Sequence, residues 1–223
     1  MDFLEKKFED LEYLETHDEN FDPEKKHPLI IDIHGAGGRN TSLKVIGNRF
    51  LYEAIKERGY GFVTAAPLCR HDSWFDCFET LKRFIDDLIS RDYIDEDRVY
   101  LIGTSMGGYC VWQLALSTPE KFAAIVPICG GGMYWNARRL VDLPIWAFHG
   151  ALDTTVYPEE SQKMVDAVNR RGGNAKLTIY PDCEHAAWVP AFADQDVYKW
   201  LLSNSRKKRQ TESDNFDDVK KFG

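Results

Sequence analysis

Short apolar runs alternate with longer amphipathic stretches from Pro28 to Leu202. Each apolar run is continuous rather than alternating, which is the pattern of strands buried on both faces of a parallel sheet. Alternation of such strands with helices is typical of βαβ units and predicts an α/β protein. The runs predict strands at Leu29–His34, Gly61–Ala66, Val99–Ile102, Ala123–Ile128, Ile145–Phe148 and Lys176–Tyr180.

The stretches between these strands predict helices that cover both faces of the sheet. Within residues 43–58 the apolar positions recur at helical spacing, so one side of that helix should pack on the sheet. No internal repeat or linker interrupts residues 28–202, which we therefore expect to form a single domain. The predicted helices are Leu43–Arg58, Phe78–Ser90, Gly107–Ser117, Pro158–Arg171 and Pro190–Leu202.

The two ends of the chain have a different composition. Residues 1–27 hold ten acidic side chains and four lysines, and Leu11, Tyr13 and Leu14 could form an antiparallel edge strand there. Residues 203–223 are charged and poor in apolar side chains, so we expect a flexible tail. Its basic run Arg206–Arg209 could mark a localisation or anion-binding patch, but a solvated tail is the simpler interpretation.

Composition and charge exclude several classes of function. The net charge of −8 argues against a nucleic-acid-binding protein, which would need a basic excess. Five cysteines without a C-x-x-C pair indicate neither a disulfide framework nor a thiolate metal site, and we expect reduced thiols in a cytoplasmic protein. No apolar run has the length of a signal peptide core or a membrane span, so no membrane association is expected.

The segment Gly103-Thr104-Ser105-Met106-Gly107 carries the strongest chemical signal. It has the pattern G-x-S-x-G between a predicted strand and a predicted helix, where a sharp turn exposes the serine hydroxyl. Glycines on either side allow the close backbone approach that this turn requires. An ordinary glycine and serine turn is the alternative, but the strand and helix context makes Ser105 the candidate nucleophile.

A serine nucleophile needs a base and an acid, and both follow later strands. Asp153 follows the strand Ile145–Phe148 and His185 follows Lys176–Tyr180. This is the chain order of nucleophile, acid and histidine that accompanies a G-x-S-x-G turn. We expect His185 to move the proton of Ser105 and Asp153 to orient the histidine. Asp182 and Glu184 share the loop of His185 and are the weaker candidates for the acid, while His149 is interpreted as a packed, hydrogen-bonded residue.

An oxyanion hole requires backbone donors beside the nucleophile. The N–H of Met106 at the helix start is one candidate, and the glycine-rich loop after the first strand supplies the second, from Ala36 or from Gly37. This loop has neither P-loop nor dinucleotide-binding spacing. We interpret His34 as an anchor of the loop rather than as a catalytic residue.

Aromatic residues in the predicted loops near the strand ends could line a substrate pocket. Packing against neighbouring helices is an equally simple interpretation of them. Trp188 is favoured because it lies three residues after His185, whereas Trp112 and Trp200 fall inside helices and should be core residues. The candidate substrate-binding residues are Trp74, Tyr134, Trp135 and Trp188.

Several segments together resemble the α/β-hydrolase superfamily, and more narrowly its phospholipase/carboxylesterase, dienelactone hydrolase and feruloyl esterase group. The resemblance implies an α/β-hydrolase fold with an eight-stranded, mostly parallel sheet, a Ser-His-Asp triad and no cofactor or metal. The short acidic N-terminus barely represents the first strands of this fold, so we expect six to eight strands in the sheet, and the short stretch between Pro67 and Phe78 leaves little room for a lid. The segments that carry the resemblance are 34–38, 97–108, 126–132, 144–153 and 185–188.

The expected function is therefore that of a serine carboxylesterase acting on small-molecule esters, with aryl or cinnamoyl esters among the candidates. A serine peptidase related to the oligopeptidases is an alternative, although those enzymes usually carry an additional gating domain. A binding protein on a hydrolase scaffold is a third, disfavoured because Ser105, Asp153 and His185 are all present. The residues leave the oligomeric state open.

Overall fold

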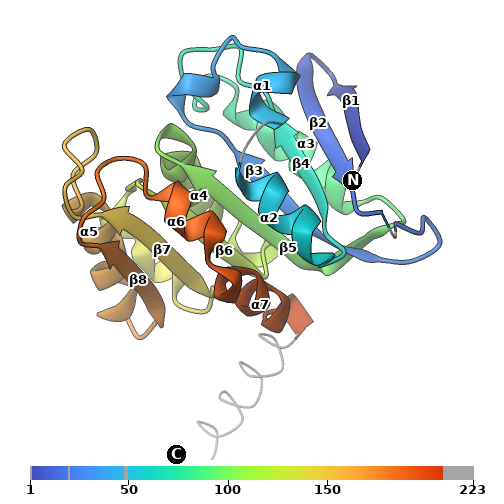
Figure 1. The fold of residues 1–223 in the computed structure, drawn as a ribbon. Helices are drawn as coiled ribbons and strands as arrows, with labels where there is room; N and C mark the ends of the chain where they lie inside the picture. Colours follow the sequence, from blue (N-terminus) through green and yellow to red (C-terminus); the bar gives the residue numbers. More distant parts are fainter. Residues whose placement is uncertain (1, 20, 48–49, 208–223) are drawn as a thin grey trace, which may run out of the picture.

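The computed structural model describes residues 2–19, 21–47 and 50–207 (Figure 1). Its centre is an eight-stranded sheet with the order β1-β2-β4-β3-β5-β6-β7-β8. The strands from β3 onward pair in parallel, while β1 pairs with β2 and β2 with β4 in antiparallel fashion. The strands are β1 (Asp2–Phe8), β2 (Leu11–His17), β3 (His27–Ile33), β4 (Val63–Pro67), β5 (Ile94–Thr104), β6 (Ala124–Ile128), β7 (Ile145–Gly150) and β8 (Ala175–Tyr180).

The expected α/β fold with a mostly parallel sheet of six to eight strands is confirmed, and the sheet has eight strands, at the upper end of that range. The acidic N-terminus contributes two strands instead of one. Leu11, Tyr13 and Leu14 do lie in an antiparallel strand, but β1 rather than β2 occupies the edge of the sheet. The acidic and lysine side chains of β1 are exposed or half-buried, so this strand does not show the apolar pattern of a core strand.

Helices cover both faces of the sheet (Figure 1). Side chains of α2, α6 and α7 pack on one face around Phe62 and Tyr100. Side chains of α3, α4 and α5 pack on the other face, in the larger cluster around Leu101 and Trp112. The helices are α1 (Leu43–Gly47), α2 (Phe50–Arg58), α3 (Phe78–Ile89), α4 (Met106–Ser117), α5 (Glu159–Asn169), α6 (Trp188–Ala193) and α7 (Gln195–Ser203).

Two stretches expected to be single helices are each divided in two. Residues 43–58 form α1 and α2, and residues 48–49 between them lie outside the described part of the chain. Residues 188–203 form α6 and α7, because Asp194 adopts an extended conformation and its side chain caps α7 by accepting a hydrogen bond from the Asp196 N–H. The amphipathic spacing continues across both breaks, so periodicity alone does not locate them.

The parallel strands end in register at one edge of the sheet. Ile33 of β3 pairs with Gly103 of β5, and Ile128 of β6 pairs with both Thr104 and Phe148. The loops after β3, β5, β7 and β8 therefore leave the sheet side by side, which is where ligands bind in open α/β folds. This edge carries the candidate site.

At the C-terminal end, Arg206 and Lys207 lie 3.8 and 3.5 Å from carboxylate oxygens of Asp97. The rest of the basic run, Lys208 and Arg209, falls outside the described residues, as does the remainder of the predicted tail. In the described ranges, the structure has no helix that is long and apolar enough to cross a membrane.

Candidate active site

Ser105 lies on the sharp turn between β5 and α4, in a backbone conformation that residues other than glycine rarely adopt. Its backbone has φ 56° and ψ −118°, and its N–H donates a 2.8 Å hydrogen bond to the Ile128 carbonyl. A Cβ on Gly107 would lie only 1.9 Å from the Ile33 carbonyl oxygen, and one on Gly103 would lie 2.5 Å from the Gly107 oxygen. Both glycines are thus required for the turn that strains Ser105 and directs its hydroxyl away from the sheet.

The structure brings together Ser105, His185 and Asp153 from three separate loops. His185 Nε2 lies 2.9 Å from Ser105 Oγ, and His185 Nδ1 lies 2.7 Å from Asp153 Oδ2. Because a carboxylate only accepts hydrogen bonds, Nδ1 carries the proton and Nε2 is free to accept the serine hydroxyl proton. The arrangement has the geometry by which a histidine activates a serine hydroxyl.

Asp153 is buried, and its carboxylate is fully occupied. Its Oδ1 accepts hydrogen bonds of 2.9 and 3.0 Å from the backbone N–H groups of Thr155 and Val156. Burial by itself would raise the pKa of Asp153, but the hydrogen bonds from His185 and these two backbone groups outweigh it, so the pKa lies below its usual value. Asp153 therefore stays ionised beside the histidine.

The weaker candidates for the acid lie elsewhere. Asp182 and Glu184 are exposed, whereas Asp153 is buried behind the histidine ring. His149 is buried next to the acid: its Nε2 lies 2.9 Å from the Val156 carbonyl oxygen and its Nδ1 lies 2.7 Å from Ser161 Oγ. His149 thus holds the loop of Asp153 in place as a packed, hydrogen-bonded residue, which is how the sequence was interpreted. Its contact with Ser161 was not predicted.

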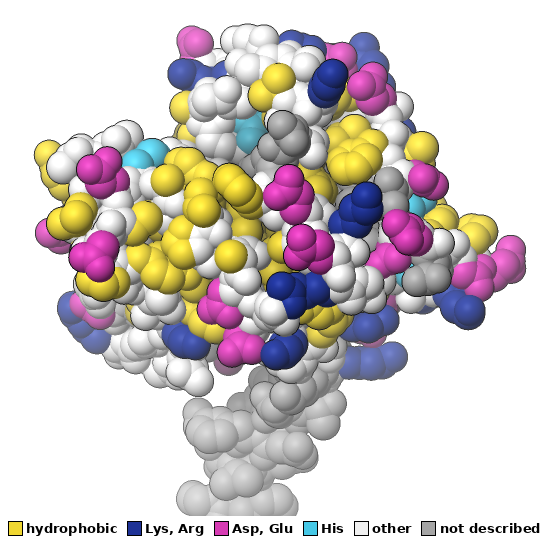
Figure 2. Space-filling model, viewed as in Figure 1, with side chains coloured by type: hydrophobic (Ala, Val, Ile, Leu, Met, Phe, Trp, Pro, Cys, Tyr) yellow, Lys and Arg dark blue, Asp and Glu magenta, His cyan; other side chains and the backbone are white. Residues whose placement is uncertain are grey.

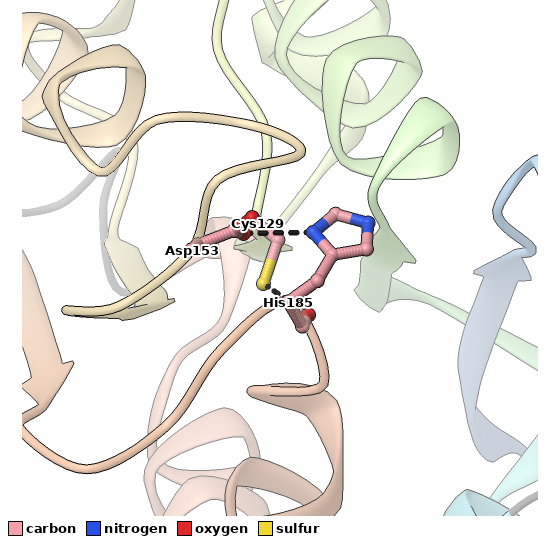
Figure 3. Close-up of side chains that lie close together, drawn as sticks. All are labelled: Cys129, Asp153 and His185. Atoms are coloured by element: carbon pink, nitrogen blue, oxygen red, sulfur yellow. Dashed lines mark hydrogen bonds and ion pairs between the residues drawn. The ribbon is translucent and has the colours of Figure 1, made fainter.

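Figure 3 shows a third side chain, Cys129, close to Asp153 and His185. Its Sγ donates a 3.1 Å hydrogen bond to the backbone carbonyl of His185. Burial raises the pKa of the Cys129 thiol to about 12, so it stays protonated. Possible metal-ligand atoms of the three side chains lie within 4.8 Å of one another. They already bond within the cluster, His185 Nδ1 to Asp153 Oδ2 and Cys129 Sγ to the His185 carbonyl, so these contacts hold His185 in place.

The loop after β3 lines the same cavity as Ser105. His34 Nε2 accepts a 3.0 Å hydrogen bond from the Cys69 N–H, so its Nδ1 is protonated and donates to the Gly35 carbonyl at 2.7 Å. Arg39 Nε donates to the Ala36 carbonyl at 3.2 Å. These contacts fix the two peptide groups whose N–H atoms belong to Ala36 and Gly37, the two candidate oxyanion donors.

A cavity of about 450 Å³ opens over the nucleophile. It brings together Ser105, His185, Ala36, Gly37 and Trp188, whose ring meets the His185 ring edge to face at 5.4 Å. The N–H of Met106 stands at the start of α4, directly after Ser105. The sequence missed three other lining residues: Thr155, which directly follows the acid's turn, and two apolar residues of α1 that periodicity assigns to a core face, Val45 and Ile46.

Three of the four aromatic candidates do not line this cavity. The prediction for Trp74 is wrong: its side chain is 0% exposed, and its indole N–H donates a 2.9 Å hydrogen bond to the His34 carbonyl beneath the loop. Tyr134 and Trp135 are exposed on a 3₁₀ segment, Tyr134–Leu140, and neither borders the catalytic cavity. Trp188 alone of the four lies at the site.

The fold and this site define a hydrolase of the α/β class, and comparison with known proteins agrees. The alpha/beta hydrolase fold family matches residues 54–199, and the chain belongs to this family. Among solved structures, a thermostable esterase is 30% identical, with a TM-score of 0.78 over 92% of this chain and 63% of that one. Est1E from Butyrivibrio proteoclasticus shares the fold at 17% identity, with a TM-score of 0.69 over 90% of this chain and 98% of its own.

Curated relatives include both peptidases and an esterase. Dipeptidyl-peptidase 5 of Porphyromonas gingivalis is 26% identical over 222 residues, which is 76% of this chain and 32% of that protein. The bifunctional acetylxylan esterase/xylanase XynS20E of Neocallimastix patriciarum is 24% identical over 78% of this chain and 31% of its own length. The chain thus spans about a third of the length of these two relatives.

Proposed function

We propose that this protein is a serine hydrolase that cleaves carboxylic esters through an acyl-enzyme intermediate. The observation that carries the proposal is the chain of contacts from Ser105 Oγ through His185 to Asp153, at 2.9 and 2.7 Å, on the wall of the 450 Å³ cavity. A strained nucleophile, a singly protonated histidine and an ionised acid are the parts that acyl transfer requires.

In the proposed reaction, Ser105 Oγ attacks the ester carbonyl carbon while His185 Nε2 takes the hydroxyl proton. The oxyanion is stabilised by the N–H of Met106 and by an N–H of the Ala36–Gly37 loop. His185 then gives its proton to the alkoxide, which leaves as the alcohol. Water repeats the cycle on the acyl-enzyme: it loses its proton to His185, attacks the carbonyl carbon and releases the acid, and Ser105 regains its proton.

Ester substrates are supported by one solved esterase structure and by one curated esterase among the relatives. The thermostable esterase is 30% identical over 92% of the chain, and the acetylxylan esterase supports the same bond type. An aryl acyl group is one substrate class that the Trp188 ring, beside His185, could contact. The name of one structural neighbour, a ferulic acid esterase with a TM-score of 0.68, concerns such a group.

Dipeptidyl-peptidase activity is the second candidate. It is favoured by the relative from Porphyromonas gingivalis, which aligns with 76% of this chain. Both activities use the same triad, so they differ in the leaving group and in the residues that bind it. The substrate therefore has to be determined by direct comparison.

The triad is tested by labelling the protein with a fluorophosphonate and assaying p-nitrophenyl acetate. We expect stoichiometric labelling at Ser105 and inhibition of turnover in the same proportion. No turnover and no labelling would remove the proposed function. To separate esterase from peptidase, methyl ferulate, short acyl esters and dipeptidyl anilides are compared under one set of conditions, and faster cleavage of the anilide would reverse the ranking.

A further inference from the structure

A second, larger cavity lies between the N-terminal hairpin and α1. It measures about 750 Å³, and its lining comes from β1, β2 and α1. The apolar part of the lining consists of Phe3, Leu14, Leu43 and Val45. On the face drawn in Figure 2, hydrophobic side chains are exposed over α1 and the β1–β2 hairpin, with charged side chains among them.

Val45 joins this cavity to the catalytic one. It lines both, and it is 52% exposed, so it forms a low ridge between them rather than a buried wall. Its neighbour Ile46 faces the catalytic cavity while packing in one buried cluster with Leu14 and Leu43 of the second. The two cavities are therefore consecutive parts of one groove along α1, the helix that follows the oxyanion loop.

The chemistry of the second cavity selects an uncharged, flexible ligand. Its floor offers aliphatic and aromatic carbon, and its lining holds one acid and one base, Glu5 and Lys44. A ligand charge of either sign would thus meet both an attractive and a repulsive side chain, whereas each methylene removed from water there gains binding by up to about fourfold. The walls carry no set of convergent polar groups that would orient a sugar or a peptide.

We propose that this second cavity binds the aliphatic chain of an ester whose carbonyl group lies at Ser105. The inference rests on the proposed function and names its substrate class: esters with a long alkyl chain, on either the acyl or the alcohol side. The chain leaves the catalytic cavity over Val45 and lies against Phe3, Leu14 and Leu43.

Adjacent residues of β1 offer a matched pair of variants. Phe3 and Glu5 line the cavity, and Leu4 between them lies on the opposite face of the strand, as the strand period requires. Phe3 and Leu4 are 48% and 37% exposed, so a carboxylate at either position meets solvent at a similar cost. Phe3→Asp places a charge against the proposed alkyl chain, and Leu4→Asp places the same charge away from it.

The test measures kcat/KM for p-nitrophenyl esters from acetate to dodecanoate, and for acetate esters of alcohols from ethanol to dodecanol. We expect kcat/KM to rise with chain length in one of the two series, which identifies the side of the ester that carries the chain. Phe3→Asp should lower the ratio of kcat/KM for the long esters to kcat/KM for p-nitrophenyl acetate by about tenfold or more, whereas Leu4→Asp should keep the wild-type ratio. A flat chain-length profile, or equal loss in both variants, would overturn the inference.

Two further measurements keep the inference separate from folding and from the proposed function. If Phe3→Asp fails to fold, Glu5→Trp replaces it in the test. The indole fills the cavity from its rim without adding a charge, and it should shorten the preferred chain. Titration of Ser105→Ala with decanol and with butanol tests the alkyl site without catalysis, and we expect decanol to bind at least about tenfold more tightly. Equal affinities would reject the site even if esters are cleaved, while absence of ester cleavage with tight decanol binding would reject the function alone.

Discussion

Two buried carboxylates, Glu15 in the N-terminal hairpin and Asp153 behind His185, are stabilised in different ways. Glu15 is 0% exposed and is held by two cationic side chains and a histidine: Lys6 Nζ and His17 Nε2 each lie 2.7 Å from its Oε1, and Arg91 bonds its Oε2. Asp153 is 2% exposed and has two backbone N–H donors and His185.

The different surroundings of Glu15 and Asp153 indicate different roles, one in the stability of the fold and one in the proposed reaction. Charges of opposite sign around Glu15 neutralise it, so its contribution is to hold β2 against the rest of the sheet. The donors around Asp153 keep it ionised without neutralising it, so its charge remains available to stabilise a protonated His185. We therefore expect substitutions near Asp153 to change the reaction and substitutions near Glu15 to change the free energy of unfolding.

The largest effect is expected for Ser105→Ala, which removes the nucleophile at the catalytic side. If Ser105 and His185 act as one unit, kcat for p-nitrophenyl acetate should fall by about 10⁶. Steady-state kinetics measure this fall, and thermal unfolding should show a midpoint close to that of wild type because a small side chain is retained on the turn. A loss of less than tenfold would assign the reaction to another nucleophile.

Asp153→Asn keeps the shape of the buried acid and removes its charge. The amide would favour the wrong tautomer of His185, so kcat should fall by about 10⁴ while the fold persists. Rates and urea unfolding of the same preparation distinguish the two effects. Near-normal kcat would show that Asp153 is not the acid, and Asp182→Asn and Glu184→Gln would then be measured as its replacements.

Glu15→Gln is the counterpart at the hairpin, and it should change stability rather than rate. Burial would raise the pKa of Glu15, but hydrogen bonds from His17 and Lys6 and the charges of Lys6 and Arg91 outweigh it and lower the pKa from 4.5 to about 2. A shift of this size corresponds to about 3 kcal/mol of the free energy of unfolding at pH 7. Urea unfolding measures the loss, with p-nitrophenyl acetate turnover unchanged in the folded variant.

The sign of this shift also fixes its pH dependence. Because the folded pKa of Glu15 lies below the unfolded value, its contribution is complete above pH 4.5 and is lost as the pH falls from there towards about 2. The stability difference between wild type and Glu15→Gln should therefore shrink when urea unfolding is repeated at pH 3. A difference that is the same at pH 7 and at pH 3 would contradict an ionised Glu15.

The catalytic side could be predicted from the sequence because its requirements are local. The turn at Ser105 needs glycines at fixed spacing, and the acid and the histidine follow identifiable strands in a fixed chain order. Each constraint is carried by the few residues around one side chain, so the sequence records it even though Ser105 and His185 lie 80 residues apart. The order of the parallel strands then brings the three loops to one edge of the sheet.

Strand β2 of the hairpin was predicted, but strand β1 and the burial of Glu15 were not, because they depend on contacts that are distant in sequence. One partner of the buried Glu15 is Arg91, 76 residues away, and a charged stretch such as residues 1–17 otherwise indicates a solvated surface. Trp74 was misassigned for the same reason, since the carbonyl group that holds its indole belongs to His34, 40 residues earlier. Periodicity likewise places Val45 and Ile46 of α1 on a core face, whereas both line the cavity over Ser105.

Trp74 offers the smallest test of the same distinction, because it touches the oxyanion loop and yet is a core residue. Trp74→Phe keeps an aromatic ring and removes the N–H that donates to the His34 carbonyl. We expect a loss of about 1 to 2 kcal/mol in the free energy of unfolding. The ratio of kcat/KM for methyl ferulate to that for methyl acetate should stay unchanged, since a side chain with 0% exposure does not contact an acyl group. If instead the ratio falls at unchanged stability, Trp74 belongs to the substrate site, and residues that affect stability are not distinct from residues that affect the reaction at this loop.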